Sequence, residues 1–385
     1  MKRLILIRLA TMLLPMISLT GQTPQAKPPV AVAPVPVSSS TIPQWRIKFF
    51  HDQNNSGIDF NELALPGPQT ICAFGTFGEA GKRPRGVMVR SGDGGQTWET
   101  IKLPDLPVSA DFVDGRNGWL VTRDAVHRTL DGGLTWKRSA KLKGVLRVKF
   151  LTEQRGFAVG FPKAVWSTAD GGATWAPLPA AQLPASRPEN STYSTITFHD
   201  GRRGIITGSS RPPRRNASPL PPWMDPATQQ RQVPTSLLVL ETSDGGQTWT
   251  HAVTSAFGQL GRVAFGASGG GLGLMEYTGG SFAYASEVLN LSNSKTAFAD
   301  KDRAIQDLAY DGGGRAWIAG IAVAGTLNQL PIPSKVVVLQ SIDSQHWYSV
   351  PVDYRAVANR VRIAFAGETG WLVTDGGMIL TLEKK

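Results

Sequence analysis

Short apolar runs separated by polar, glycine-rich turns recur along the chain at a nearly constant interval. Stretches such as 87–90 (VMVR) and 125–128 (AVHR) have the length and side-chain character of β-strands. An octapeptide of the form S/T-x-D-x-G-x-T-W follows each of these runs. Its four copies are SGDGGQTW at 91–98, TLDGGLTW at 129–136, TADGGATW at 168–175 and TSDGGQTW at 242–249. The pattern predicts a repeat array built from β-hairpins.

The octapeptide has the chemistry of a tight turn. Its aspartate can accept hydrogen bonds from backbone N–H groups a few residues later, and its glycines reach positive φ without a steric penalty. Threonine and tryptophan then suit the start of the return strand. We expect a structural role for all four pairs of box residues: Asp93 and Trp98, Asp131 and Trp136, Asp170 and Trp175, Asp244 and Trp249.

This octapeptide resembles the Asp-box, or bacterial neuraminidase repeat, of β-propellers. The resemblance implies that each box links the third and fourth strands of a blade, on the rim of the disc and away from any active site. It also implies that loops between second and third strands lie on the opposite face. We call that opposite face the upper face and the box-bearing face the lower face.

A second signature precedes the boxes and allows the blades to be counted. An aromatic residue is followed six positions later by a small and an apolar residue, as in Phe112 with Gly118 and Trp119. Degenerate boxes at 291–298 and 341–347 extend the array, and segment 44–48 supplies a fourth strand for the last blade. We therefore expect an all-β, seven-bladed propeller with four-stranded antiparallel blades, closed by the N-terminal strand. Six and eight blades are the alternatives.

The N-terminal region predicts export. Residues 1–21 combine a basic start with an apolar run and read as a signal peptide, cleaved or retained as an anchor. Residues 22–43 form a linker rich in proline, alanine and valine, and the propeller occupies 44–385. We expect a periplasmic or extracellular protein, or one of the thylakoid lumen if the host is photosynthetic.

The charge balance indicates the kind of partner. The 385-residue chain carries a formal charge of +11. Such a surface favours acidic protein segments or membrane-surface proximity, while export argues against nucleic acid. Histidines lack metal-ligand spacing and the glycine runs do not open a helix, so we expect no metal and no cofactor. We expect a monomer.

Three groups of basic residues are candidates for the partner-binding face. An insertion at 209–235 lengthens blade four, and residues 78–86 form a loop in blade one. A further set lies in first strands, three residues before the aromatic residue of the second signature. There it forms a basic ring at the channel mouth or pairs with acids of neighbouring blades. The candidates are Arg147, Arg262 and Arg362 in the ring position, Arg211, Arg214 and Arg215 in the insertion, and Lys82, Arg83 and Arg85 in the blade-one loop.

With these arginines, the chain over 44–382 resembles the photosystem II assembly and stability factor propellers. The resemblance implies a non-catalytic scaffold that binds a membrane-complex subunit through a basic surface. On the ring interpretation, reversing the charge of Arg147, Arg262 and Arg362 should abolish partner capture and change stability by only about 1–2 kcal/mol.

Two other function classes remain open from the sequence. A sialidase-like or other Asp-box glycoside hydrolase would use the three arginines with a tyrosine–glutamate pair or with paired carboxylates. A glycan-binding surface module would use exposed aromatic residues such as Trp223.

Overall fold

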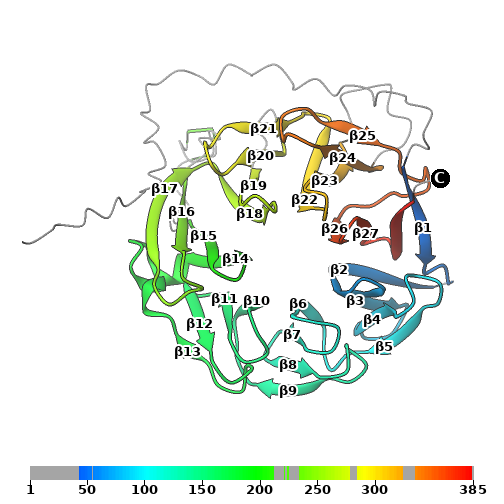
Figure 1. Ribbon diagram of the computed structural model, residues 1–385, viewed down its shortest axis with the longest axis horizontal. Helices are drawn as coiled ribbons and strands as arrows, with labels where there is room; N and C mark the ends of the chain where they lie inside the picture. The colour runs from blue at the N-terminus through cyan, green and yellow to red at the C-terminus, as the bar shows by residue number, and fades with distance from the viewer. Residues whose placement is uncertain are drawn as a thin grey trace, which may run out of the picture.

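The computed structural model describes residues 43–53, 55–211, 221, 223–224, 234–277, 284–323 and 334–383. The expected signal peptide and linker lie outside these residues, as does most of the 209–235 insertion. In the described part, 28 strands form seven four-stranded antiparallel sheets arranged as blades around a central channel (Figure 1). The expected fold is confirmed.

Each blade takes four strands that are consecutive in the chain, except the last, which takes its outer strand from the N-terminal end of the propeller. The strands, from the channel outward, are β2 (Ser56–Gly67), β3 (Thr70–Glu79), β4 (Arg85–Ser91) and β5 (Glu99–Lys102) in blade 1; β6 (Pro107–Phe112), β7 (Gly118–Thr122), β8 (Val126–Thr129) and β9 (Lys137–Ala140) in blade 2; β10 (Val145–Phe150), β11 (Gly156–Gly160), β12 (Ala164–Thr168) and β13 (Ala176–Pro177) in blade 3; β14 (Ser191–His199), β15 (Arg203–Ser210), β16 (Thr235–Thr242) and β17 (Thr250–Ala256) in blade 4; β18 (Gly258–Phe265), β19 (Gly271–Tyr277), β20 (Ser286–Asn290) and β21 (Thr296–Ala299) in blade 5; β22 (Arg303–Tyr310), β23 (Ala316–Ala322), β24 (Val336–Ser341) and β25 (Tyr348–Val350) in blade 6; and β26 (Val361–Ala366), β27 (Thr369–Thr374), β28 (Met378–Glu383) and β1 (Gln44–Phe50) in blade 7. Two short 3-10 helices, η1 (Pro179–Gln182) and η2 (Pro188–Asn190), lie between blades 3 and 4.

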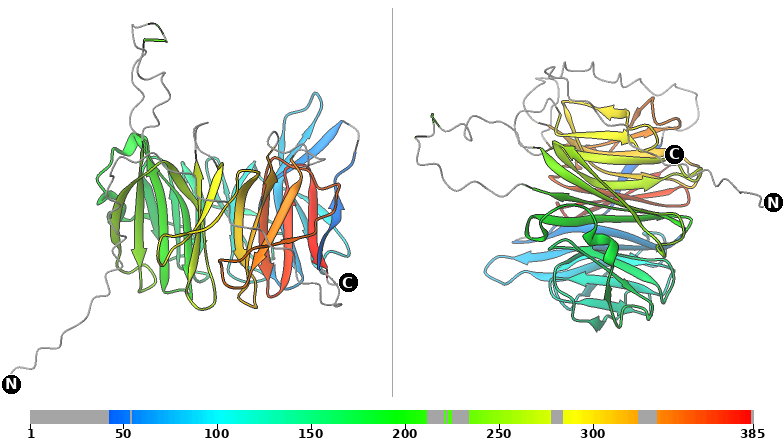
Figure 2. Two further views of the ribbon diagram at one scale, coloured as in Figure 1. Left: turned by 90° about the horizontal axis from the view of Figure 1, so that it is seen from above. Right: turned by 90° about the vertical axis from the view of Figure 1, so that its left-hand side faces the viewer.

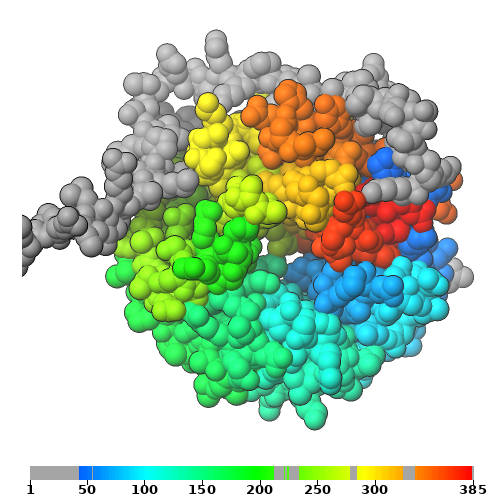
Figure 3. Space-filling view, in the orientation of Figure 1, coloured from blue at the N-terminus to red at the C-terminus, as the bar shows by residue number. Residues whose placement is uncertain are grey.

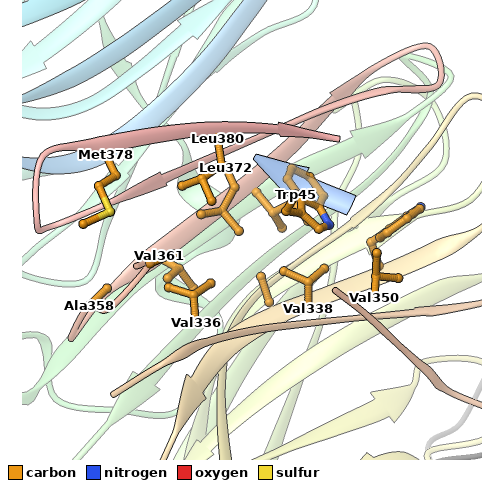
Figure 4. Close-up of a cluster of buried hydrophobic side chains, with 13 residues drawn as sticks. Trp45, Val336, Val338, Val350, Ala358, Val361, Leu372, Met378 and Leu380 are labelled. Carbon is orange, nitrogen blue, oxygen red and sulfur yellow. The ribbon is translucent and has the colours of Figure 1, made fainter. Parts of the chain in front are cut away.

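The ring is closed by pairing β1 with β28. Their register runs from Gln44 opposite Glu383 to Phe50 opposite Met378. Trp45 of β1 is fully buried, and its ring lies 6.1 Å from that of Trp317 in blade 6. Figure 4 shows Trp45 among the aliphatic side chains of blades 6 and 7. This closure removes the free sheet edges that an open array would expose next to its terminal blades.

Box tryptophans fill the interfaces between blades. The ring centroid of Trp136 in blade 2 lies 6.2 Å from that of Phe74 in blade 1. Trp249 in blade 4 lies 5.6 Å from Phe157 in blade 3. Edge-to-face contacts of this kind bury large apolar surfaces and fix the angle between neighbouring sheets. The spacing of the boxes therefore sets the packing of the whole disc.

The antiparallel order of the strands separates the two faces. Box turns contact the turns between first and second strands, as where the Gly132 N–H donates to the Arg116 carbonyl at 2.9 Å. The opposite ends carry the loops between second and third strands. The β3–β4 hairpin rises on that upper side in the left view of Figure 2. The 209–235 insertion leaves β15 and returns to β16 on the same side.

Candidate functional site

A β-bulge recurs in the innermost strand of six blades, at matching positions. The register shifts fall between Phe60 and Glu62, Pro107 and Ser109, Val145 and Arg147, Tyr193 and Thr195, Leu260 and Arg262, and Ile305 and Asp307. Bulges re-aim the side chain that follows them. In blade 7, Arg362 occupies the equivalent position opposite Val373. One residue per blade is thus presented at the same level of the channel.

These seven positions form what we call the channel ring: Glu62, Ser109, Arg147, Thr195, Arg262, Asp307 and Arg362. All except Ser109 line a cavity of about 180 Å³ in the channel. Figure 3 shows the opening at the centre of the disc. The structure therefore brings together the three arginines that the sequence placed in one register.

Two ring arginines are paired with acids of other blades. Arg147 Nη1 lies 3.0 Å from Glu62 Oε2, and Arg262 Nε lies 3.4 Å from Asp307 Oδ1. Glu62 was missed in the sequence because blade 1 has Leu65, and no aromatic residue, three positions later. Its position directly after the bulge, which it shares with the ring residues of five other blades, identifies Glu62 in the structure. The three arginines thus lie around the channel, and two of them are ion-paired.

Arg362 differs from the other two arginines. Its Nη1 donates to the backbone carbonyls of Gln306 (3.3 Å) and Val361 (2.9 Å). Among the described residues, no carboxylate oxygen lies within 4.0 Å of its guanidinium nitrogens. The buried Nε atoms of Arg147 and Arg362 have no hydrogen-bond partner in the described structure. These two donors are therefore left unsatisfied within the ring.

The ring carries three cations and two anions. Burial alone would raise the pKa of Glu62, but the guanidinium groups of Arg147, Arg262 and Arg362 outweigh burial, and that pKa lies below its ordinary value. Burial lowers the pKa of Arg362, and repulsion from Arg262 adds to this. Burial and this repulsion both disfavour the charged form of Arg362. An additional carboxylate in the cavity would therefore stabilise that charge.

Two carboxylates, those of Glu62 and Asp307, line the cavity, and paired carboxylates are one of the two arrangements considered for hydrolysis. No tyrosine is among its lining residues in the described structure. Tyr193 is buried and donates to the Ala181 carbonyl, and Tyr277 is hydrogen-bonded to Glu287 in blade 5. Glu62 has a lowered pKa, which is the opposite of what a general acid needs. Both carboxylates of the cavity are held in ion pairs, Glu62 with Arg147 and Asp307 with Arg262.

The other predicted basic residues lie away from the ring. Lys82, Arg83 and Arg85 are exposed on the β3–β4 hairpin, where Lys82 pairs with Glu79. Arg211 is exposed at the end of β15 in blade 4, on another side of the disc (Figure 1). Arg214 and Arg215 lie outside the described residues. The structure does not join the hairpin, Arg211 and the ring into one continuous patch.

Lower-face arginines have structural roles that the sequence did not reveal. The Arg90 guanidinium donates to the Gly132 carbonyl, and that of Arg155 donates to the Gly245 carbonyl. Each bond joins one blade to the box turn of the next. These arginines are consequently engaged within the fold, whereas Arg202 on the same face is exposed.

Among the described residues, no group of three or more histidine, cysteine, aspartate or glutamate side chains is arranged to hold a metal ion. No helix in the same residues is long and apolar enough to cross a bilayer. Trp223 is 73% exposed and is not among the cavity-lining residues.

Comparison with known proteins gives a structural likeness only. No family model matches the chain, and no curated protein matches it. Among solved structures, YCF48 bound to D1 peptide is 16% identical with a TM-score of 0.57, covering 92% of this chain and 100% of that one. YCF48 from Cyanidioschyzon merolae is 17% identical with a TM-score of 0.54, over 88% and 98%.

The structure is also similar to that of an enzyme. Virginiamycin B lyase from Staphylococcus aureus with quinupristin is 10% identical with a TM-score of 0.52, covering 89% of this chain and 100% of that one. At these identities the comparisons establish a shared propeller fold.

Proposed function

We propose that this chain is an exported, non-catalytic propeller scaffold that binds an acidic segment of a protein partner at its upper face. The observation that carries the proposal is the channel ring, with three arginines against two carboxylates around a cavity. Arg362 is the ring cation that has no carboxylate partner among the described residues, so it is assigned to the partner's carboxylate. Guanidinium groups bind carboxylates in a directed, two-pronged geometry.

The peptide-bound YCF48 structure supports this proposal by analogy. That propeller is described as bound to a D1 peptide. A carboxylate-bearing segment of a membrane-protein subunit is therefore the partner class we assign here. The role is photosynthetic in a photosynthetic host and belongs to another membrane complex elsewhere. The exposed hairpin residues Lys82, Arg83 and Arg85 contribute to attraction over longer distances, because they remain in solvent.

Simultaneous charge reversal of the three ring arginines is a poor test, contrary to the expectation from sequence. An acid at position 147 would face Glu62 and one at position 262 would face Asp307, both in a largely buried channel. Breaking a buried pair costs about 3–5 kcal/mol, which exceeds the 1–2 kcal/mol expected from sequence. A neutral replacement of Arg362 avoids this, since it removes no ion pair.

The test is the binding of a fluorescently labelled, glutamate-rich peptide, measured by anisotropy, with its glutamine counterpart as a second probe. Arg362→Gln should weaken binding by about tenfold, equivalent to about 1.4 kcal/mol. Arg202→Gln is the matched control, because Arg202 is exposed on a lower-face loop. Binding should also weaken as salt is raised.

Two results would overturn the proposal. One is an equal loss of affinity in Arg202→Gln and Arg362→Gln, which would mean that net charge alone attracts the peptide. The other is equal binding of the glutamine peptide. Thermal melting of both variants separates a local loss of binding from a loss of folding.

A further inference from the structure

The outermost strand of blade 4, β17, has an unusual edge. It is seven residues long, and it pairs with β16 continuously from Thr250 opposite Glu241 to Ala256 opposite Thr235, without a bulge. The other outer strands are two to four residues long, apart from β1. In the described part of the chain no strand pairs with the far side of β17. Figure 1 shows it on the outer rim of the disc.

This edge lacks the features with which proteins usually block strand pairing. Among the other outer strands, β5 and β9 carry charges, β13 ends in proline, and β21 and β25 are only four and three residues long. The strand β1 is as long as β17 but carries Arg46 and Lys48. The sequence of β17, THAVTSA, contains no lysine, arginine, acid or proline. An exposed, regular and uncharged edge is a template for a further strand.

The side chains of β17 are open to solvent along nearly its whole length. All residues from Thr250 to Ser255 are exposed, and Val253 is 42% exposed. None of them lines the channel cavity. Recognition of a foreign strand gains its specificity from pockets that take alternate side chains. The side chains of β17 lie in solvent, so a partner strand is selected by cross-strand pairing with these side chains.

A second copy of β17 fulfils that condition by symmetry. Antiparallel pairing about Val253 places Thr250 opposite Ala256, His251 opposite Ser255 and Ala252 opposite Thr254. No like charges oppose each other in this register, which is required for a chain with a charge of +11. Both copies contribute the same surface to this isologous contact, so the assembly is complete with two copies.

We propose that β17 mediates an antiparallel homodimer, in which the blade 4 sheets of two copies become continuous across a two-fold axis. A single strand pair buries less than the roughly 1,200 Å² typical of stable complexes. The dimer is therefore weak and depends on concentration. It lies on the rim, away from the channel ring, so it is independent of the proposed partner binding and departs from the monomer expected from sequence.

Sedimentation equilibrium of the chain over a range of concentrations tests the proposal. The wild-type mass should rise towards that of a dimer, and Thr254→Lys should remain monomeric, because the two lysines would lie diagonally across the two-fold axis on the same face of the sheet and repel each other. Thr100→Lys is the matched control: Thr100 is an exposed threonine on β5, the outer strand of blade 1, and this variant should dimerise like wild type. A wild type that is monomeric throughout, or an equal effect of Thr100→Lys, would overturn the proposal.

A crosslinking experiment fixes the register independently of these variants. Cys72 is the only cysteine of the chain and is fully buried, so Val253→Cys introduces the one reactive thiol. Mild oxidation should link two Val253→Cys chains covalently, because the two-fold axis brings position 253 opposite itself. Thr100→Cys should stay monomeric under the same conditions. Failure of Val253→Cys to crosslink faster than Thr100→Cys would rule out this pairing.

Discussion

The aspartate of each box acts as the organising centre of its turn. In blade 3, Asp170 accepts hydrogen bonds from the Thr174 hydroxyl (2.6 Å), the Thr174 N–H (2.9 Å) and the Thr168 hydroxyl (2.8 Å). Together these bonds lower the pKa of Asp170 to about 2. Gly171 and Gly172 adopt φ values of 71° and 87°, which a side chain would strain. The turn thus depends on an ionised carboxylate and on two glycines.

This geometry predicts a pH-dependent contribution to stability. The pKa of Asp170 is lower in the folded protein than the unfolded value of about 3.9, so its stabilising effect is full above about pH 5 and is lost towards pH 2. Asp170→Asn should therefore lower the melting temperature at neutral pH, and the difference from wild type should shrink as pH falls from 5 to 2. Melting curves monitored by circular dichroism across this range provide the measurement.

Asp124→Asn serves as the control for this prediction. Asp124 is an exposed aspartate in the turn between β7 and β8, outside the boxes. Its replacement should change the melting temperature little at any of these pH values. A melting-temperature difference for Asp170→Asn that is constant from pH 5 to pH 2 would contradict the proposed role of the ionised carboxylate.

The channel ring illustrates which residues of the site can be predicted from the sequence and which cannot. Arg147, Arg262 and Arg362 share a register that the spacing to an aromatic residue reveals. Glu62 lacks that aromatic marker, and its pairing with Arg147 spans two blades across the channel. Such a contact depends on the tilt and closure of the ring, which local spacing does not encode. The net positive charge of the ring is consequently smaller than its three arginines alone suggest.

At the scale of elements, β1 has the greatest effect on the structure because it closes the ring. Segment 44–48 is identifiable because its tryptophan mimics that of a box. The structure adds the reason for its importance, since the Trp45 side chain packs against Trp317 and Phe365 at the junction of blades 6 and 7. Loss of this side chain would leave a cavity at the point where the two ends of the propeller meet.

Trp45→Ala should lower the free energy of unfolding by about 3–5 kcal/mol, as large-to-small changes at fully buried aromatic positions do. Urea denaturation followed by circular dichroism measures this difference. Trp223→Ala is the matched control because Trp223 is 73% exposed, and it should have little effect. Equal destabilisation by the two changes would show that β1 does not close the ring in solution.

The elements themselves were largely predictable, whereas their irregularities were not. Box spacing and the aromatic signature identify hairpins because turn chemistry is local to a few residues. The bulges of the innermost strands and the unprotected length of β17 depend on how a strand meets its neighbours. Both features underlie the proposed interactions, and neither can be located from the sequence.

At the scale of the whole molecule, the repeat separates two surfaces with different tasks. The lower face holds the box turns, and arginines such as Arg90 and Arg155 are hydrogen-bonded across blades there. The channel ring, the β3–β4 hairpin and Arg211 present cationic groups that are less fully engaged. Arginines of the lower face are thus partly tied into contacts between blades, although Arg202 remains exposed there.

Hydrogen–deuterium exchange of the chain with and without the glutamate-rich peptide tests this division most directly. We expect bound peptide to slow amide exchange in the bulged parts of β2, β10 and β18 and in β26 around Arg362, while exchange in the box turns at 91–98 and 168–175 stays unchanged. Slowed exchange concentrated in the box turns, with none in the innermost strands, would contradict it.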